Sequence, residues 1–114
     1  MALLDKAKFL QQDDYEYKDV HLKALGGEVR IKALSIRDQL SFEKEAADKN
    51  QDESNLMFNL ILKCCIDEKG ELLFNEEDLE AIKDKSADVI VHLFKEILKI
   101  NHINQDEVDG LAKN

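Results

Sequence analysis

Apolar and charged residues alternate on both sides of a Gly-Gly pair in the stretch VHLKALGGEVRIKAL, which spans residues 20–34. The apolar positions recur at every second residue: Val20, Leu22 and Ala24 before the glycines, and Val29, Ile31 and Ala33 after them. A period of two is typical of strands that bury one face, and Gly26-Gly27 can supply the positive φ angles of a two-residue turn. The pattern predicts a β-hairpin over about residues 17–33. Because a two-stranded ribbon is marginal alone, helices must cover its apolar face.

After the hairpin the apolar period changes to that of helices. The spacing predicts helices at about residues 35–49, 53–66, 76–83, 86–101 and 105–110. Candidate N-caps precede four of them, at Ser35, Asn75, Ser86 and Asn104, the last with Glu107 in a capping box. The segment 53–66 is apolar on nearly every face, which predicts that it is the central helix. The predicted fold is therefore α+β, a hairpin packed on four to five helices in a single domain spanning residues 15–114.

Residues 1–14 form a separate arm in this interpretation. Leu3, Leu4, Ala7 and Leu10 stand at helical spacing before the polar run QQDD. A helix of one to two turns is marginal in water, so it must dock on its own domain or on a neighbour. A frayed terminus is the alternative.

The charge balance of the chain narrows the classes of partner. Its 114 residues carry a formal net charge of −9, whereas nucleic acids and anionic membranes attract clustered Lys and Arg. We expect neither as a ligand. No apolar run reaches the roughly 18 residues of a membrane span, and the first residues lack a signal-peptide pattern, so we expect a cytoplasmic protein.

The residues that could carry chemistry do not combine into a site. Cys64 and Cys65 are adjacent in an apolar helical pattern, where we expect reduced, buried thiols. His21, His92 and His102 fall in separate predicted elements without metal-ligand spacing, and His92 is expected to be partly buried beside the apolar stripe of its helix.

The acidic segment DEKGELLFNEED, residues 67–78, has a glycine in the fourth position where a calcium-binding EF-hand loop has it in the sixth. Helix capping explains its carboxylates instead. Phosphate-loop, serine-hydrolase and zinc-protease motifs are also missing from the sequence. We therefore expect no enzyme, no metal and no cofactor.

Three segments of the chain match motifs of one protein family. Gly27, Val29, Ile31, Leu34 and Ser35 match its hairpin pattern G-x-V-x-I/V-x-x-L-S. The second segment matches at Cys65, Asp67, Gly70, Leu73, Phe74, Asp78 and Leu79, and the third, a helix ending in I-x-x-h-N/S, at Ile97, Ile100 and Asn101. In this order and over about residues 17–103, the chain resembles the tail assembly chaperones of long-tailed, siphovirus-type bacteriophages.

The resemblance implies a function without catalysis. Proteins of this family bind and solubilise the tape measure protein during tail morphogenesis, in the host cell cytoplasm, and leave before the tail is complete, so they are not part of the mature virion. Many are also made in a longer form by a −1 ribosomal frameshift, and that form is a further expected partner. Ala112-Lys113-Asn114 can be encoded as GCA-AAA-AAC, which contains a slippery heptamer. This hypothesis fails if the coding DNA has no slippery run there.

Coating a long client requires many copies, so we expect a homo-oligomer. Association can use the apolar arm, the open edges of the hairpin, or both. The candidate residues for self-association are Leu3, Leu4, Leu10, Val20, Leu22, Val29 and Ile31. The alternative is a small acidic inhibitor or DNA mimic that binds a basic groove. A mimic needs carboxylates along one continuous face, whereas caps and loops hold them here.

Overall fold

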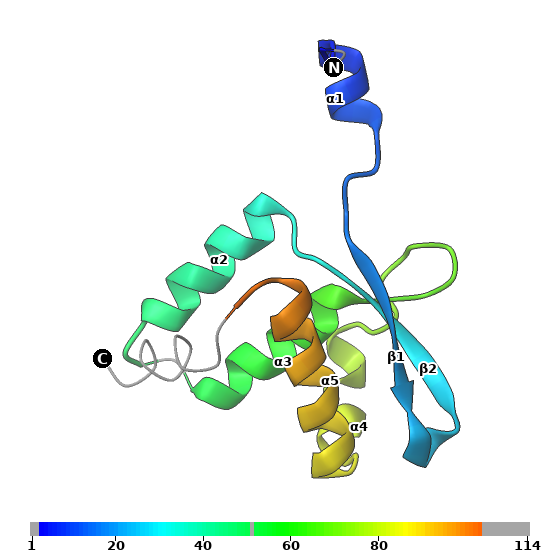
Figure 1. The fold of residues 1–114 in the computed structure, drawn as a ribbon. Coiled ribbons are helices and arrows are strands. Elements are labelled where there is room, and N and C mark those ends of the chain that lie inside the picture. Colours follow the sequence, from blue (N-terminus) through cyan, green and yellow to red (C-terminus); the bar gives the residue numbers. More distant parts are fainter. Residues whose placement is uncertain (1–2, 51, 104–114) are drawn as a thin grey trace.

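A three-stranded antiparallel sheet with strand order β1-β2-β3 packs on helices in the computed structural model, which describes residues 3–50 and 52–103 (Figure 1). The predicted α+β class is confirmed. In chain order the elements are α1 (Lys6–Gln11), β1 (Tyr17–Leu22), β2 (Gly27–Lys32), α2 (Ile36–Ala47), α3 (Glu53–Cys64), β3 (Cys65–Ile66), α4 (Leu79–Lys83) and α5 (Ala87–Ile100). The helix predicted at 105–110 lies outside the described residues.

Two of the predicted N-caps make side-chain hydrogen bonds, and a third does not. Ser35 accepts a hydrogen bond from the Asp38 N–H at 3.1 Å and so begins α2. Asn75 and Asp78 form a capping box around a short 3₁₀ helix, Glu76–Asp78, which leads into α4. Ser86 stands at the N-cap of α5, but its side chain makes no capping hydrogen bond.

The hairpin turn is longer than predicted. Leu22 pairs with Gly27, and the residues between them form a 3₁₀ helix, Lys23–Leu25, closed by Gly26 at φ 68°. Gly26 alone needs the left-handed region, since Gly27 is already the first residue of β2. The prediction of a two-residue Gly-Gly turn is therefore wrong. A longer loop that ends in a left-handed glycine closes the hairpin instead.

A third strand occupies the end of the segment predicted as helix 53–66. The helix stops at Cys64, and Cys65 and Ile66 pair with Ile31 and Arg30 of β2. Periodicity cannot separate a short buried strand from the last turn of a buried helix, which explains the error. This pairing covers Arg30 and Ile31 on the second side of β2, while β1 is an edge strand of the sheet.

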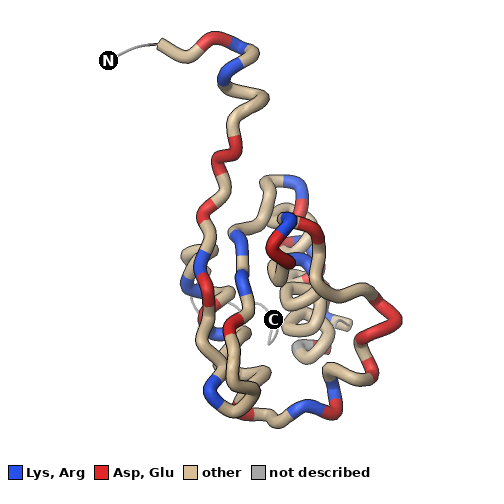
Figure 2. Tube along the Cα trace, turned by 90° about the vertical axis from the view of Figure 1, so that its right-hand side faces the viewer, with Lys and Arg blue, Asp and Glu red and all other residues tan. Residues whose placement is uncertain are grey.

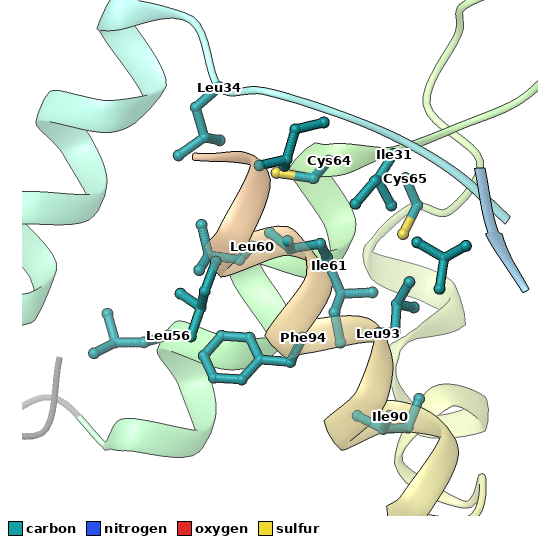
Figure 3. Close-up of a cluster of buried hydrophobic side chains, with 14 of the residues drawn as sticks. Ile31, Leu34, Leu56, Leu60, Ile61, Cys64, Cys65, Ile90, Leu93 and Phe94 are labelled. Carbon is teal, nitrogen blue, oxygen red and sulfur yellow. The ribbon is translucent and has the colours of Figure 1, made fainter. Parts of the chain in front are cut away.

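Helix α5 joins the helices to the hairpin, while α3, the helix predicted to be central, has no exposed residue from Leu56 to Cys64. Helix α5 contacts α3 on one side and both strands of the hairpin on the other, while α2 packs on α3. Six of its apolar side chains are buried: Ile90, Leu93, Phe94, Ile97, Leu98 and Ile100. They meet side chains from β2 and α3 in one cluster, in which Ile31, Leu60 and Ile61 are among the most buried (Figure 3).

One carboxylate is buried among these apolar residues. Glu96 on α5 is 8% exposed and accepts a hydrogen bond from the Lys18 ammonium on β1. Lys99 lies 3.4 Å from the other carboxylate oxygen but is largely exposed. The hydrogen bond from Lys18 holds the pKa of Glu96 below its ordinary value of 4.5, against the opposing effect of burial. This ion pair joins β1 to α5.

Asn101, the residue after α5, joins three parts of the fold. Its Oδ1 accepts a hydrogen bond from the Leu34 N–H at 2.7 Å, at the point where β2 leads to α2. Its Nδ2 donates to the Ile97 carbonyl at 2.9 Å and lies 3.9 Å from the Cys64 sulfur at the end of α3. An amide is the side chain that can accept and donate here at once.

We expect Asn101→Ala to lower the free energy of unfolding by about 2 kcal/mol, because the part-buried Leu34 N–H loses its acceptor. Asn101→Asp is the comparison variant: a carboxylate still accepts from Leu34, but it faces the Ile97 carbonyl oxygen without a proton to donate and adds a negative charge at the end of α5, so it should be destabilised as well. Urea denaturation measures both. An Asn101→Ala variant within about 0.5 kcal/mol of the parent chain would contradict this role.

We expect Lys18→Ala to destabilise the chain by about 1 kcal/mol at pH 7, and Lys99→Ala by less than half of that. A carboxyl group whose pKa is lower in the folded chain contributes stability above its unfolded pKa and loses it as the pH falls. The difference between Lys18→Ala and the parent should therefore shrink as the pH drops below 4.5. Thermal unfolding at a series of pH values checks this, and a difference that grows in acid would refute it.

Candidate interaction surfaces

Helix α1 stands away from the folded body (Figure 1) and none of its residues is buried. Asp5 caps it by accepting a hydrogen bond from the Lys8 N–H at 2.8 Å. Leu4 and Phe9 occupy the positions of a hydrophobic staple, before the cap and in the fourth helical position. The large apolar side chains of the arm are all exposed: Leu3 by 97%, Leu4 by 61%, Phe9 by 69% and Leu10 by 67%. The arm predicted from the sequence thus contains a capped helix that is not buried against any of the residues that the structure describes.

Short-range bonds fix the segment between α1 and β1. The Tyr17 hydroxyl donates to the Asp13 carboxylate, which also accepts from the Tyr15 N–H at 3.0 Å. These bonds lower the pKa of Asp13, the Tyr17 hydroxyl being the main cause. The Lys32 ammonium lies 4.7 Å from the centre of the Tyr15 ring. The end of the arm that joins β1 is therefore held in place on the hairpin.

The hairpin residues proposed for self-association are buried or packed against the core, unlike the exposed arm residues. Val20, Leu22 and Ile31 are buried in the core and Val29 packs against it. Their side chains are used within the chain, so any contact through the hairpin falls to the backbone of the open β1 edge. That edge carries Lys18, Asp19 and His21, and charged side chains on an edge strand hinder pairing with another strand.

The outer face of the hairpin is polar. Asp19 and Arg30 are direct cross-strand neighbours, and the Arg30 guanidinium approaches the Asp19 carboxylate at 2.7 Å. This hydrogen bond lowers the pKa of Asp19. Both side chains are well exposed, so the pair contributes little to stability and mainly keeps this face hydrated.

An apolar groove of about 380 Å³ opens where the hairpin turn meets α4 and α5. Leu25 and Val29 line it from the hairpin, Ala81 from α4 and Val89 from α5. Two charged residues, Asp78 and Lys85, lie among its otherwise mostly apolar lining. Leu25 is 54% exposed, which is unusual for a leucine in contact with so much apolar surface. We call this feature the apolar groove.

Sequence reasoning did not find this groove. Its residues come from the hairpin, α3, the linker before α4, α4 itself, the connection after it and α5, and their convergence depends on the fold. Leu73 and Phe74, in the linker before α4, both line the groove. Leu25 directly before Gly26-Gly27, an apolar residue at a turn, was the one available signal.

The candidate chemical groups do not gather into a site in the part of the chain that the structure describes. No group of three or more His, Cys, Asp or Glu residues there has the geometry of a metal site. His92 is exposed, so the prediction that it is partly buried is wrong. His102 lies after α5 with its Nε2 3.8 Å from a Glu16 carboxylate oxygen, and both side chains are well exposed.

No helix among the described residues is long and apolar enough to cross a membrane.

Comparisons with protein-family models, curated proteins and solved structures found no match to this chain. The surfaces above are therefore the basis for the functional argument, together with the sequence resemblance.

Burial makes Cys64 and Cys65 inert. Neither sulfur is in a disulfide, and desolvation raises the pKa of each thiol to about 12. We expect the native chain at pH 8 to react with a thiol-specific reagent such as DTNB more than a hundredfold more slowly than the chain in urea. Absorbance at 412 nm follows the reaction. Two thiols that react in the native chain as fast as free cysteine would contradict the burial.

Proposed function

We propose that this chain is a phage tail assembly chaperone, which binds the tape measure protein and keeps it soluble while the tail is built. The observation that carries the proposal is the arm: it has four exposed apolar side chains, two directly before a capped helix and two on it, and none of the residues of that helix is buried. An isolated six-residue helix does not persist in water without packing. The arm is therefore a part of the chain that functions in contact with another molecule.

The net negative charge of the chain is compatible with a chaperone function. A net charge of −9 keeps free copies apart and soluble, although each exposes an apolar arm. It also disfavours contact with nucleic acid in the host cytoplasm, where the proposed client is made. Copies of the chain must then associate through specific apolar contacts and not through non-specific aggregation. A transient coat requires this.

Self-association into a coat is part of the proposal. The long client offers many equivalent sites, and copies that hold one another bind it with a higher effective concentration than independent copies. The arm provides the contact surface, since the hairpin side chains first considered for this role lie in the core or against it. The frameshifted longer form would share the same arm and join the same coat.

The alternative of an acidic inhibitor or DNA mimic has less support. Figure 2 shows acidic positions on the arm, the hairpin and the connections around α4, with basic positions between them. A mimic needs negative charge at regular spacing along one face. On the hairpin, Asp19 is instead neutralised by Arg30.

Co-expression with the tape measure protein of the same phage tests the proposal. We expect the soluble fraction of that protein to rise several-fold when this chain is present, because exposed apolar segments of the client are covered. The double variant Leu4→Glu/Leu10→Glu should lose most of the effect, whereas Leu40→Glu, an exposed leucine on α2 in the folded body, should keep it. A tape measure protein equally insoluble with and without the chain would contradict the proposal. If a pull-down with this chain recovered a nucleic-acid enzyme and not the tape measure protein, the inhibitor alternative would be favoured.

A further inference from the structure

We propose that the arm of one copy of this chain docks in the apolar groove of a second copy. The inference rests on the self-associating part of the proposed function, but not on the identity of the client. It joins the two exposed apolar features described above, one convex and one concave, into a single interface.

The arm has the form of a groove-binding helix. Such helices insert apolar side chains from one face into a hydrophobic groove, with charged residues left at the rim. Leu3, Leu4, Phe9 and Leu10 supply the apolar side chains. Lys6 and Lys8 lie between them on the helix. Docking would give α1 the packing that so short a helix needs.

The groove has a matching lining and an opposite charge at its rim. Its centre is apolar, with Val29, Ile82 and Val89 at positions where leucine and phenylalanine side chains can pack. Residues 76–85, which include Asp78, Ala81, Ile82 and Lys85 of the groove lining, carry five carboxylates and two lysines: Glu76, Glu77, Asp78, Glu80, Asp84, Lys83 and Lys85. Residues 3–11 of the arm carry Lys6 and Lys8 against Asp5. In a chain of net charge −9, a basic segment meets an acidic rim, which favours this pairing over contact between two acidic surfaces.

The arm cannot easily fill the groove of its own chain. Strand β1 begins at Tyr17 beside the arm and ends at Leu22 beside the groove, so the two features lie at opposite ends of the strand (Figure 1). The strand is roughly 20 Å long, and residues 12–16 span at most about 17 Å when fully extended. That segment is also bonded to the hairpin, through the Tyr17 hydroxyl to Asp13 and through the Ala33 N–H to the Glu16 carbonyl at 3.0 Å. A second copy has no such constraint.

An interface between two different surfaces has a consequence for the assembly. Each copy that gives its arm to a neighbour still offers its own groove to a third copy. Repetition of such a contact produces a ring or an open helical filament, not a closed pair. Either form fits a coat around a long client.

Two variants of the full chain separate the two halves of the interface. Leu4→Glu/Leu10→Glu places charges on the arm, and Ala81→Glu places one in the groove at an exposed position of α4. Leu40→Glu is the control, since Leu40 is 57% exposed on α2 and outside the groove. Circular dichroism and thermal unfolding confirm that each variant folds, and Leu25→Glu, on the hairpin side of the groove, replaces Ala81→Glu if that variant does not.

Light scattering after size exclusion then measures the mass from micromolar to millimolar concentration. We expect the parent chain and Leu40→Glu to grow beyond two copies with concentration, and each interface variant alone to stay near the 13.1 kDa of one chain. An equal mixture of the arm variant and the groove variant should form pairs, at twice that mass, and nothing larger. In such a pair the groove variant gives its intact arm to the intact groove of the arm variant.

Three results would overturn the inference. The first is a parent chain that stays at the mass of one copy throughout, as expected if its own arm or only a client fills the groove. The second is a groove variant that associates like the parent. The third is a mixture of folded variants that remains at one copy, because pairing of arm with arm cannot be rescued by mixing.

These outcomes are separate from the fate of the proposed function. A parent chain that stays at one copy but still keeps the tape measure protein soluble would remove this interface and leave the chaperone proposal standing. A mixture that forms pairs while the parent chain fails to keep the tape measure protein soluble would do the reverse.

Discussion

The packing of α5 against the inner face of the hairpin and against α3 is the interaction on which the rest of this structure depends. A two-stranded ribbon is marginal alone, and short helices do not persist without partners. The six buried apolar side chains of α5 cover the ribbon on one side and α3 on the other. Burial stabilises such side chains by roughly 1.5–3 kcal/mol each, far more than any surface ion pair in the chain can contribute. Asn101 and the Glu96–Lys18 pair then fix how the helix lies on the sheet.

The patterns that the sequence makes visible are those set by local periodicity. The alternation around Val20 and Ile31 and the helical stripe from Ile90 to Leu98 gave the hairpin and α5 because one face of each element is buried. The end of α3 escaped prediction because Cys64 and Cys65 are apolar in either conformation, and the decision between helix and strand rests on the pairing of Cys65 with Ile31. Tertiary contacts of this kind leave no periodic signal.

The same contrast between local pattern and tertiary contact applies to the interaction surfaces. Leu3, Leu4 and Leu10 could be recognised as an apolar arm from their helical spacing before a polar break, but their exposure could not, since docking on the same chain was equally compatible with the pattern. The hairpin residues proposed beside them were misassigned, because a strand's apolar face looks the same whether its own helices or another copy will cover it. The apolar groove could not be predicted, since segments from the hairpin to α5 that lie far apart in the sequence build it. The apolar face of the hairpin is therefore covered within the chain, whereas the arm and the groove are exposed apolar features.

Chemical cross-linking between two variants that each carry one added cysteine tests most directly whether the arm of one copy docks in the groove of another. Leu10→Cys marks the arm and Ala81→Cys marks the groove, while the native thiols, with pKa values raised to about 12, do not compete. The two variants are mixed and treated with a short bismaleimide. An arm seated in a neighbour's groove predicts a cross-linked pair that contains one copy of each variant. Cross-links between two Leu10→Cys copies alone, or no cross-link at concentrations where the chain associates, would contradict it.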